Sequence, residues 1–124
     1  MTESDAKIKT LARNIQADPG DSFSKFALAL EFLKQDELPR AKMLFENVYN
    51  NDPDYVGVYY HLGKLYERME QFSDAQKMYA EGIEIAAKQK EKRTVKELKE
   101  ARAELNAELE NDWSLEQPKI TNDE

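Results

Sequence analysis

Apolar side chains recur every three or four positions along most of the chain, which is the spacing of one face of an α-helix. The first such stripe consists of Ile8, Leu11 and Ile15 and predicts a helix over residues 4–17. Further periodic segments, separated by short polar turns, predict helices over residues 22–34, 38–50, 54–69, 72–88 and 94–110. Because joints of two to five residues separate these segments, sequence neighbours should pack antiparallel in an all-α fold.

The segment after the sixth predicted helix lacks this periodicity. Residues 111–124 contain Trp113 and Pro118 among acidic residues, and we expect them to form a disordered tail. The helical domain should therefore span residues 1–110. Trp113 either anchors the tail in a groove of this chain or on a neighbouring chain, or packs against the sixth helix near Leu109, or stays loose.

The chain also matches itself when it is shifted by 34 positions, so that Asp18-Pro19 falls on Asp52-Pro53. The matched positions keep the size class of the side chain as well as its polarity. The main pairs are Leu28 with Leu62, Ala29 with Gly63, Phe32 with Tyr66, Ala41 with Ala75, and Phe45 with Tyr79. Small residues suit close helix crossings and aromatic residues fill the gaps between helices, so the pattern indicates a helical hairpin stacked on a copy of itself.

A 34-residue period with this order of residues resembles the tetratricopeptide repeat family. The second copy carries the spacing at Tyr59, Leu62, Gly63, Tyr66, Ala75, Tyr79 and Gly82. The first copy carries it at Leu28, Ala29, Phe32, Ala41, Phe45, Val48 and Pro53. Two positions depart from the family pattern: Lys25 replaces a large aromatic residue, and Ala87 replaces the closing proline. The resemblance implies a right-handed α-α superhelix of two repeats, residues 20–53 and 54–87, with an N-terminal helix and a C-terminal capping helix.

The resemblance also implies that the first helix of each repeat lines a concave groove that binds extended or helical peptides. The first copy should present an apolar wall, Phe23, Phe26, Leu30 and Leu33, and the second a polar wall, Tyr60, His61, Lys64 and Arg68. An amphipathic peptide would place apolar anchors on the first wall and a carboxylate on Lys64 and Arg68. In the alternative interpretation the first helix covers the apolar wall and Lys64 is simply solvated.

The family's chaperone-binding members hold a carboxylate with Lys and Asn side chains on these helices. Here the corresponding positions are Phe26, Leu30 and His61, so binding of a chaperone C-terminus in that mode is not expected. The remaining hypotheses are a protein-interaction adaptor that binds a protein or peptide, and a homo-oligomer that self-assembles through the groove or the tail.

The composition of the chain argues against several other classes of function. The chain has 25 acidic and 18 basic residues, a net charge of −7, which argues against nucleic acid as the main partner. It has no cysteine, which favours a reducing, cytoplasmic location. It lacks an apolar run long enough to span a membrane. With one histidine and no glycine-rich phosphate loop, we expect no metal, no cofactor and no enzymatic activity.

Overall fold

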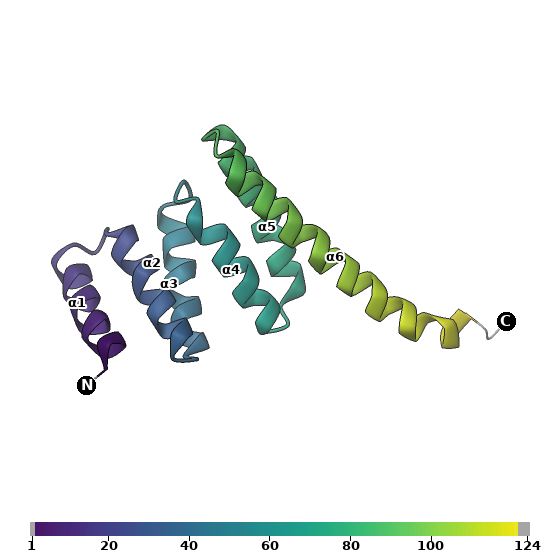
Figure 1. Ribbon diagram of the computed structural model, residues 1–124, viewed down its shortest axis with the longest axis horizontal. Coiled ribbons are helices and arrows are strands. Elements are labelled where there is room, and N and C mark those ends of the chain that lie inside the picture. Colours follow the sequence, from purple (N-terminus) through teal and green to yellow (C-terminus); the bar gives the residue numbers. More distant parts are fainter. Residues whose placement is uncertain (1, 122–124) are drawn as a thin grey trace.

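The computed structural model describes the backbone of residues 2–121 and the side chains of residues 2–111. This part of the chain contains helices and no strand, which confirms the predicted all-α class. The helices are α1 (Glu3–Ala17), α2 (Ser22–Lys34), α3 (Leu38–Asn51), α4 (Gly57–Arg68), α5 (Phe72–Lys88) and α6 (Lys92–Thr121). They follow one another in an elongated row rather than around one centre (Figure 1).

Each helix packs against the next one in the chain, and α4 also reaches α6. Side chains join α2 to α4, since the ring centroids of Phe26 and His61 are 5.4 Å apart. On the other side of the stack, the hydroxyl of Tyr49 in α3 donates to Glu81 in α5 at 2.6 Å. The helices α2, α4 and α6 therefore line one face, and α3 and α5 line the opposite face.

The core follows the repeat positions identified in the sequence. Twelve of the fourteen residues that carry the repeat spacing are buried, Phe32 is half-buried, and Pro53 lies exposed in a turn; the buried ones are Leu28, Ala29, Ala41, Phe45, Val48, Tyr59, Leu62, Gly63, Tyr66, Ala75, Tyr79 and Gly82. Tyr59, Phe45 and Tyr79 are among the largest fully buried side chains. The aromatic positions of the repeat thus fill the space between the helices, as the matched spacing predicts.

Two glycines allow the helices to approach this closely. A Cβ added to Gly63 would overlap the ring of Tyr79, and one added to Gly82 would lie 2.5 Å from the Cβ of Tyr59. The sequence places Ala29 at the position of Gly63 and Val48 at the position of Gly82 in the first repeat. The second repeat therefore has glycine where the ring of Tyr79 and the Cβ of Tyr59 leave no room for a side chain.

The backbone repeats along with the side chains. Asp36 and Glu70, which are 34 positions apart, both have a φ of 60° in the turn after the first helix of their repeat. In each turn, the backbone N–H of the following residue donates a hydrogen bond to a carbonyl in the last turn of the helix. The N–H of Glu37 donates to Phe32 O at 2.9 Å, and the N–H of Gln71 donates to Tyr66 O at 2.8 Å. This left-handed residue after a helix is a standard way of ending it.

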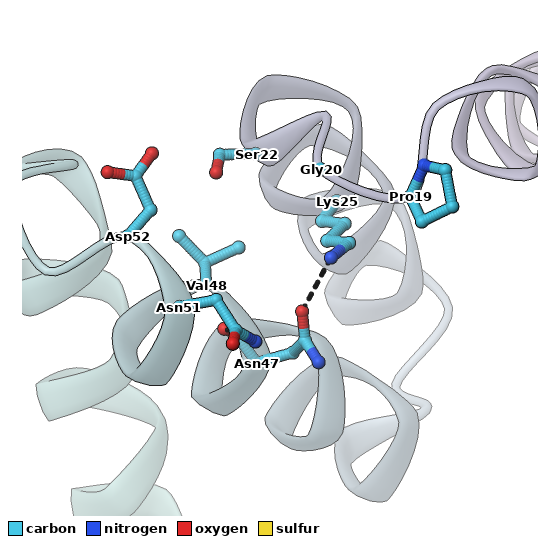
Figure 2. A pocket seen from close by; sticks show the side chains of 8 residues that line it. All are labelled: Pro19, Gly20, Ser22, Lys25, Asn47, Val48, Asn51 and Asp52. Atoms are coloured by element: carbon cyan, nitrogen blue, oxygen red, sulfur yellow. Dashed lines mark hydrogen bonds between the residues drawn. The ribbon is translucent and has the colours of Figure 1, made fainter.

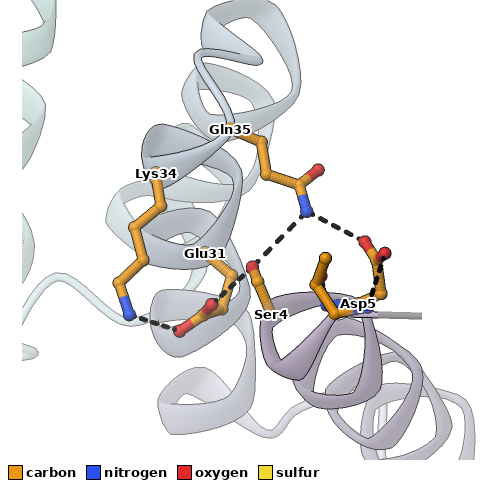
Figure 3. A network of polar contacts seen from close by, with 6 residues as sticks. Ser4, Asp5, Glu31, Lys34 and Gln35 are labelled. Atoms are coloured by element: carbon orange, nitrogen blue, oxygen red, sulfur yellow. Dashed lines mark hydrogen bonds and ion pairs between the residues drawn. The ribbon is translucent and has the colours of Figure 1, made fainter.

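A polar network attaches α1 to α2 (Figure 3). Ser4 of α1 donates to Glu31 of α2 at 2.9 Å, and Lys34 lies 3.2 Å from the other oxygen of Glu31. Gln35 donates to Asp5 at 3.0 Å. The hydrogen bond from Ser4 and the neighbouring Lys34 lower the pKa of Glu31, so this buried carboxylate is charged at neutral pH. None of the α1 side chains is fully buried, so α1 lies beside α2 without being enclosed.

The structure differs from the sequence-based expectation at two helix boundaries. The fourth helix begins at Gly57 rather than 54, because residues 52–55 form a turn in which the Tyr55 N–H donates to Asp52 O at 2.9 Å. The sixth helix runs over Lys92–Thr121 rather than 94–110. Residues 111–121, expected to be disordered, thus continue α6, and no glycine or proline precedes Pro118 to end it. The predicted docking of the Trp113 side chain, and residues 122–124, lie outside the described residues.

The substitution Gly63→Ala tests the close approach of α4 and α5. The added methyl group would collide with the ring of Tyr79, which is fully buried and hydrogen-bonded to Glu67, so we expect a loss of about 1–3 kcal/mol in the free energy of unfolding. Urea denaturation followed by circular dichroism measures it. The control is Gly20→Ala, where the nearest atom is Asp18 Oδ1 at 3.5 Å and no comparable loss is expected. Equal stability of the two variants would contradict the packing described.

Candidate functional site

The candidate site is the face formed by α2, α4 and α6. The offset of 34 pairs Ala27 with His61 and Leu30 with Lys64, so equivalent turns of α2 and α4 point to the same side. We call the following set the inner face: Phe23, Ala27, Leu30, His61, Lys64, Glu97, Glu100 and Glu104. It contains two hollows, one between α1 and α2 and one between α4 and α6.

The hollow between α1 and α2 is mainly apolar. Phe23 and Ala27 from α2 and Leu11 from α1 line it. The charged residues of the lining are Glu3, Lys7 and Glu31. The Phe23 side chain is 65% exposed although it is a large aromatic group on a well-formed helix. The alternative in which the first helix covers this wall therefore does not hold for Phe23.

The other predicted apolar anchors are packed into the fold. The ring of Phe26 lies 5.2 Å from that of Tyr55 and 5.8 Å from that of Phe45, besides its contact with His61. Leu30 and Leu33 are half-buried against the core. Phe26 therefore joins one repeat to the next, and Phe23 is the large apolar side chain that α2 leaves exposed on this face.

The hollow between α4 and α6 is polar and carries carboxylates. Tyr60, His61 and Lys64 form its α4 wall, and Ala101 with three glutamates forms its α6 wall: Glu97, Glu100 and Glu104. Sequence analysis identified the α4 residues but not the glutamates. Their spacing of three and four positions places them on one side of a helix, which is the signal that could have found them.

The two predicted cations of the inner side already have acidic partners. Lys64 lies 4.0 Å from both Glu67 and Glu104, and its ammonium is 5.8 Å from the centroid of the Tyr60 ring. Arg68 forms an ion pair of 2.8 Å with Asp36 in the turn after α2. All three pairs are partly exposed, so each is weak and exchangeable. The positive charge that the sequence suggested for the α4 wall is therefore balanced by neighbouring carboxylates.

His61 sits among aromatic rings at the centre of the face. Its ring is stacked on Phe45 with centroids 6.2 Å apart and meets Tyr60 edge-on at 5.5 Å. Burial lowers the pKa of His61 below its ordinary value, because the charged imidazolium loses hydration there. At neutral pH the side chain is therefore uncharged and contributes no cation to the inner face.

The tyrosine hydroxyls near this site are engaged in the fold. Tyr79 donates to Glu67, and Tyr66 donates to Glu46 at 2.6 Å. Burial and the hydrogen-bonded glutamates raise the pKa of both groups, so they stay protonated at neutral pH. Among residues 2–111, no group of three or more His, Asp and Glu side chains could hold a metal ion.

A third hollow lies outside the inner face, near the turn between α1 and α2 (Figure 2). Lys25 extends along it and donates to Asn47 of α3 at 2.7 Å, with Pro19 and Asp52 at its edges. In the second repeat the position of Lys25 is taken by the buried Tyr59, whose hydroxyl donates to Pro53 O at 2.6 Å. The hollow is thus the space that the missing aromatic side chain leaves, rather than a binding site.

Comparison with known proteins shows one family. Residues 32–96 match the tetratricopeptide repeat family. A tetratricopeptide repeat domain protein from Salinibacter ruber, studied in solution, is 48% identical with a TM-score of 0.69; the match covers 73% of this chain and 91% of that one. A crystal structure of a tetratricopeptide repeat domain protein from the same organism is 47% identical, with a TM-score of 0.68, over 70% of this chain and 97% of that one.

A more distant structure shares the fold alone. The TPR2B domain of yeast Sti1, in complex with pHsp70, is 15% identical with a TM-score of 0.76, and the match covers 82% of this chain and 81% of that one. No match was found among curated proteins. Separately, no helix within the described residues is long and apolar enough to cross a membrane.

The substitution Lys25→Tyr tests the origin of the third hollow. A tyrosine ring would fill the space as Tyr59 does in the second repeat, with Pro19 O in reach of its hydroxyl. We expect about 1 kcal/mol of added stability, as for other substitutions toward a repeat pattern. The control Asn47→Ala removes the Lys25 hydrogen bond alone and should change stability by less than about 0.5 kcal/mol. A Lys25→Tyr variant no more stable than the wild type in urea denaturation would contradict this account.

The pH dependence of stability tests the environment of His61. Its pKa is lower in the folded chain than the unfolded value of 6.5, so protonation favours unfolding. The stability held by neutral His61 is complete above about pH 6.5 and is lost as the pH falls toward the lowered pKa. Between pH 7.5 and pH 5.0 we expect the wild type to lose more stability than His61→Gln in urea denaturation. Equal losses would show that His61 titrates as if it were exposed.

Proposed function

We propose that this chain, which belongs to the tetratricopeptide repeat family, is a non-catalytic adaptor that binds a protein or peptide segment along its inner face. The family fold is a protein-interaction module in general. The finer assignment, to the concave groove made by α2, α4 and α6, is the proposal. The absence of cysteine supports a reducing location such as the cytoplasm.

The exposed Phe23 carries this proposal. Burying a phenylalanine side chain stabilises a complex by roughly 1.5–3 kcal/mol, and aromatic anchors of this kind dominate many interfaces. Phe23 lies in an apolar hollow, next to Leu11 and Ala27. Leaving it 65% exposed has no folding benefit, so we interpret it as a contact surface for a partner.

The rigidity of the face supports the same interpretation. Its helices are fixed by ring contacts such as those of Phe26 with His61 and with Phe45. A preformed surface loses little conformational entropy on binding, so only the partner has to be ordered. This favours recognition of a short flexible segment that becomes ordered in the groove.

The Sti1 domain, whose structure holds a pHsp70 partner, shares this fold. Here Phe26, Leu30 and His61 occupy the positions at which chaperone-binding members would carry Lys or Asn. Apolar and neutral side chains there cannot hold a terminal carboxylate. We therefore propose a different ligand for this chain.

Self-association through the end of the stack has weaker support. The offset of 34 pairs Lys7 and Asn14 of α1 with Ala41 and Val48 of α3. Ala41 and Val48 are buried, whereas Lys7 and Asn14 are exposed. Stacking another copy on this face would remove the Lys7 ammonium from water. The polar surface of α1 is that of a solvated end, and the adaptor hypothesis remains the better one.

The test uses peptides selected from a random 12-residue phage library on the immobilised wild type. Their affinities for Phe23→Ala are then compared with those for Met43→Ala by calorimetry. Met43 is the matched control, because its side chain is 63% exposed but lies on α3. We expect Phe23→Ala to weaken binding at least about tenfold, as the loss of an aromatic anchor does, and Met43→Ala to leave it within about twofold.

Both variants should unfold at the wild-type temperature, because both side chains are exposed. Selected peptides that lose affinity with Met43→Ala and keep it with Phe23→Ala would place the binding surface on the outer helices. That result would contradict the proposal.

A further inference from the structure

We infer that the inner face selects a basic segment, one with an apolar anchor followed at least five or six residues away by lysine or arginine. This inference rests on the proposed function and adds the chemistry of the partner. It reverses the charge expected from the sequence, which placed an acidic group on Lys64 and Arg68. Two observations carry it: the α4 cations Lys64 and Arg68 are already paired, and α6 contributes carboxylates.

Charge along the inner face changes from one end to the other. The end near Phe23 is apolar, whereas the hollow between α4 and α6 has Glu97, Glu100 and Glu104 on one wall and Lys64 on the other. His61 is uncharged at neutral pH because burial lowers its pKa. Three carboxylates against one ammonium give this hollow a net negative charge.

The existing ion pairs of the three α6 glutamates show where a basic side chain of the partner would bind. Glu97 lies 3.4 Å from Arg93 on its own helix, and Glu104 lies 4.0 Å from Lys64. Glu100 forms no ion pair or hydrogen bond with any of the side chains of residues 2–111. A guest ammonium or guanidinium between Glu100 and Glu104 would therefore meet two carboxylates, one of them free.

Tyr60 adds an aromatic surface to this subsite. Its ring lines the same hollow and already attracts the ammonium of Lys64 at 5.8 Å. Aromatic faces bind lysine and arginine by the same attraction. The subsite therefore offers a basic side chain both charge and a ring, which a simple solvated row of glutamates does not.

The spacing of the two ends sets the length of the partner. Directly packed helices are about 8–10 Å apart, and α2 and α4 make few direct backbone contacts, so the line from α2 through α4 to α6 is at least about 20 Å long. An extended chain covers about 3.3–3.6 Å per residue, so at least five or six residues are needed to span this distance. One peptide can thus place an apolar side chain beside Phe23 and a basic one beside Glu100.

The test is a titration of the ¹⁵N-labelled protein with three synthetic 12-residue peptides, followed by amide chemical shifts. Each has Leu at position 3 and is otherwise neutral, and positions 8, 9 and 11 are Lys in one peptide, Gln in the second and Glu in the third. At 50 mM salt we expect the Lys peptide to bind about tenfold more tightly than the Gln peptide, and the Glu peptide most weakly. The difference should shrink at 500 mM salt, because exposed charges are screened.

A matched pair of variants locates the charge effect. Glu100→Lys should weaken the Lys peptide about fivefold, because it replaces an attraction with a repulsion. Glu110→Lys makes the same change in net charge at an exposed position on the same helix, outside the hollow, and should change the affinity less than twofold. If both variants weaken the binding of the Lys peptide equally, the effect comes from the net charge of the protein and not from this hollow, and the inference is overturned.

The outcomes separate this inference from the proposed function. If the Gln and Lys peptides bind equally and both shift the amides of Ala27 and Lys64, the inner face binds peptides but does not select charge, and only this inference fails. If the library-selected peptides and all three synthetic peptides leave these amides unshifted, the proposed function fails as well.

Discussion

The structure depends on aromatic rings that lie directly against the backbone of a neighbouring helix. The ring of Tyr79 occupies the place where Gly63 lacks a side chain. At Gly82 the same place is taken by the Cβ of Tyr59, with Leu98 of α6 also close by. Protein interiors are close-packed, so such contacts accept no additional methyl group without displacement. They set the distance between α4, α5 and α6, and through it the shape of the face that α4 and α6 form together.

This rigid stack gives the inner face two ends of different chemistry. α1 is attached beside α2 through a polar network centred on Glu31, so it forms a wall of the apolar hollow and leaves Phe23 open. At the other end α6 packs by its apolar side on α5 and turns glutamates toward α4. In molecular recognition, apolar contacts usually supply affinity and charged groups usually supply specificity. The apolar end and the charged end of the inner face divide these two roles in the same way.

The repeat offset explains what could be predicted from the sequence. It placed the first five helices, the buried signature residues and the side of α4 that carries His61 and Lys64, because these follow a strict period. The offset could not predict whether the Phe26 ring is packed or exposed, because a half-buried ring and an exposed ring have the same spacing on a helix. It also could not place the α6 glutamates. Leu98, the first of three buried residues in the described part of α6, lies 36 positions after Leu62, so the register shifts by two after the longer α5.

The most direct test of the account is the position and direction of a bound peptide. The chain has no cysteine, so a nitroxide attached to a cysteine of the Lys peptide is the only spin label in the sample. We predict that a label at the basic end broadens the amide signals of Glu97 to Glu104 in α6, and that a label at the apolar end broadens those around Phe23 in α2. Broadening of α3 and α5 signals by either label would contradict the account.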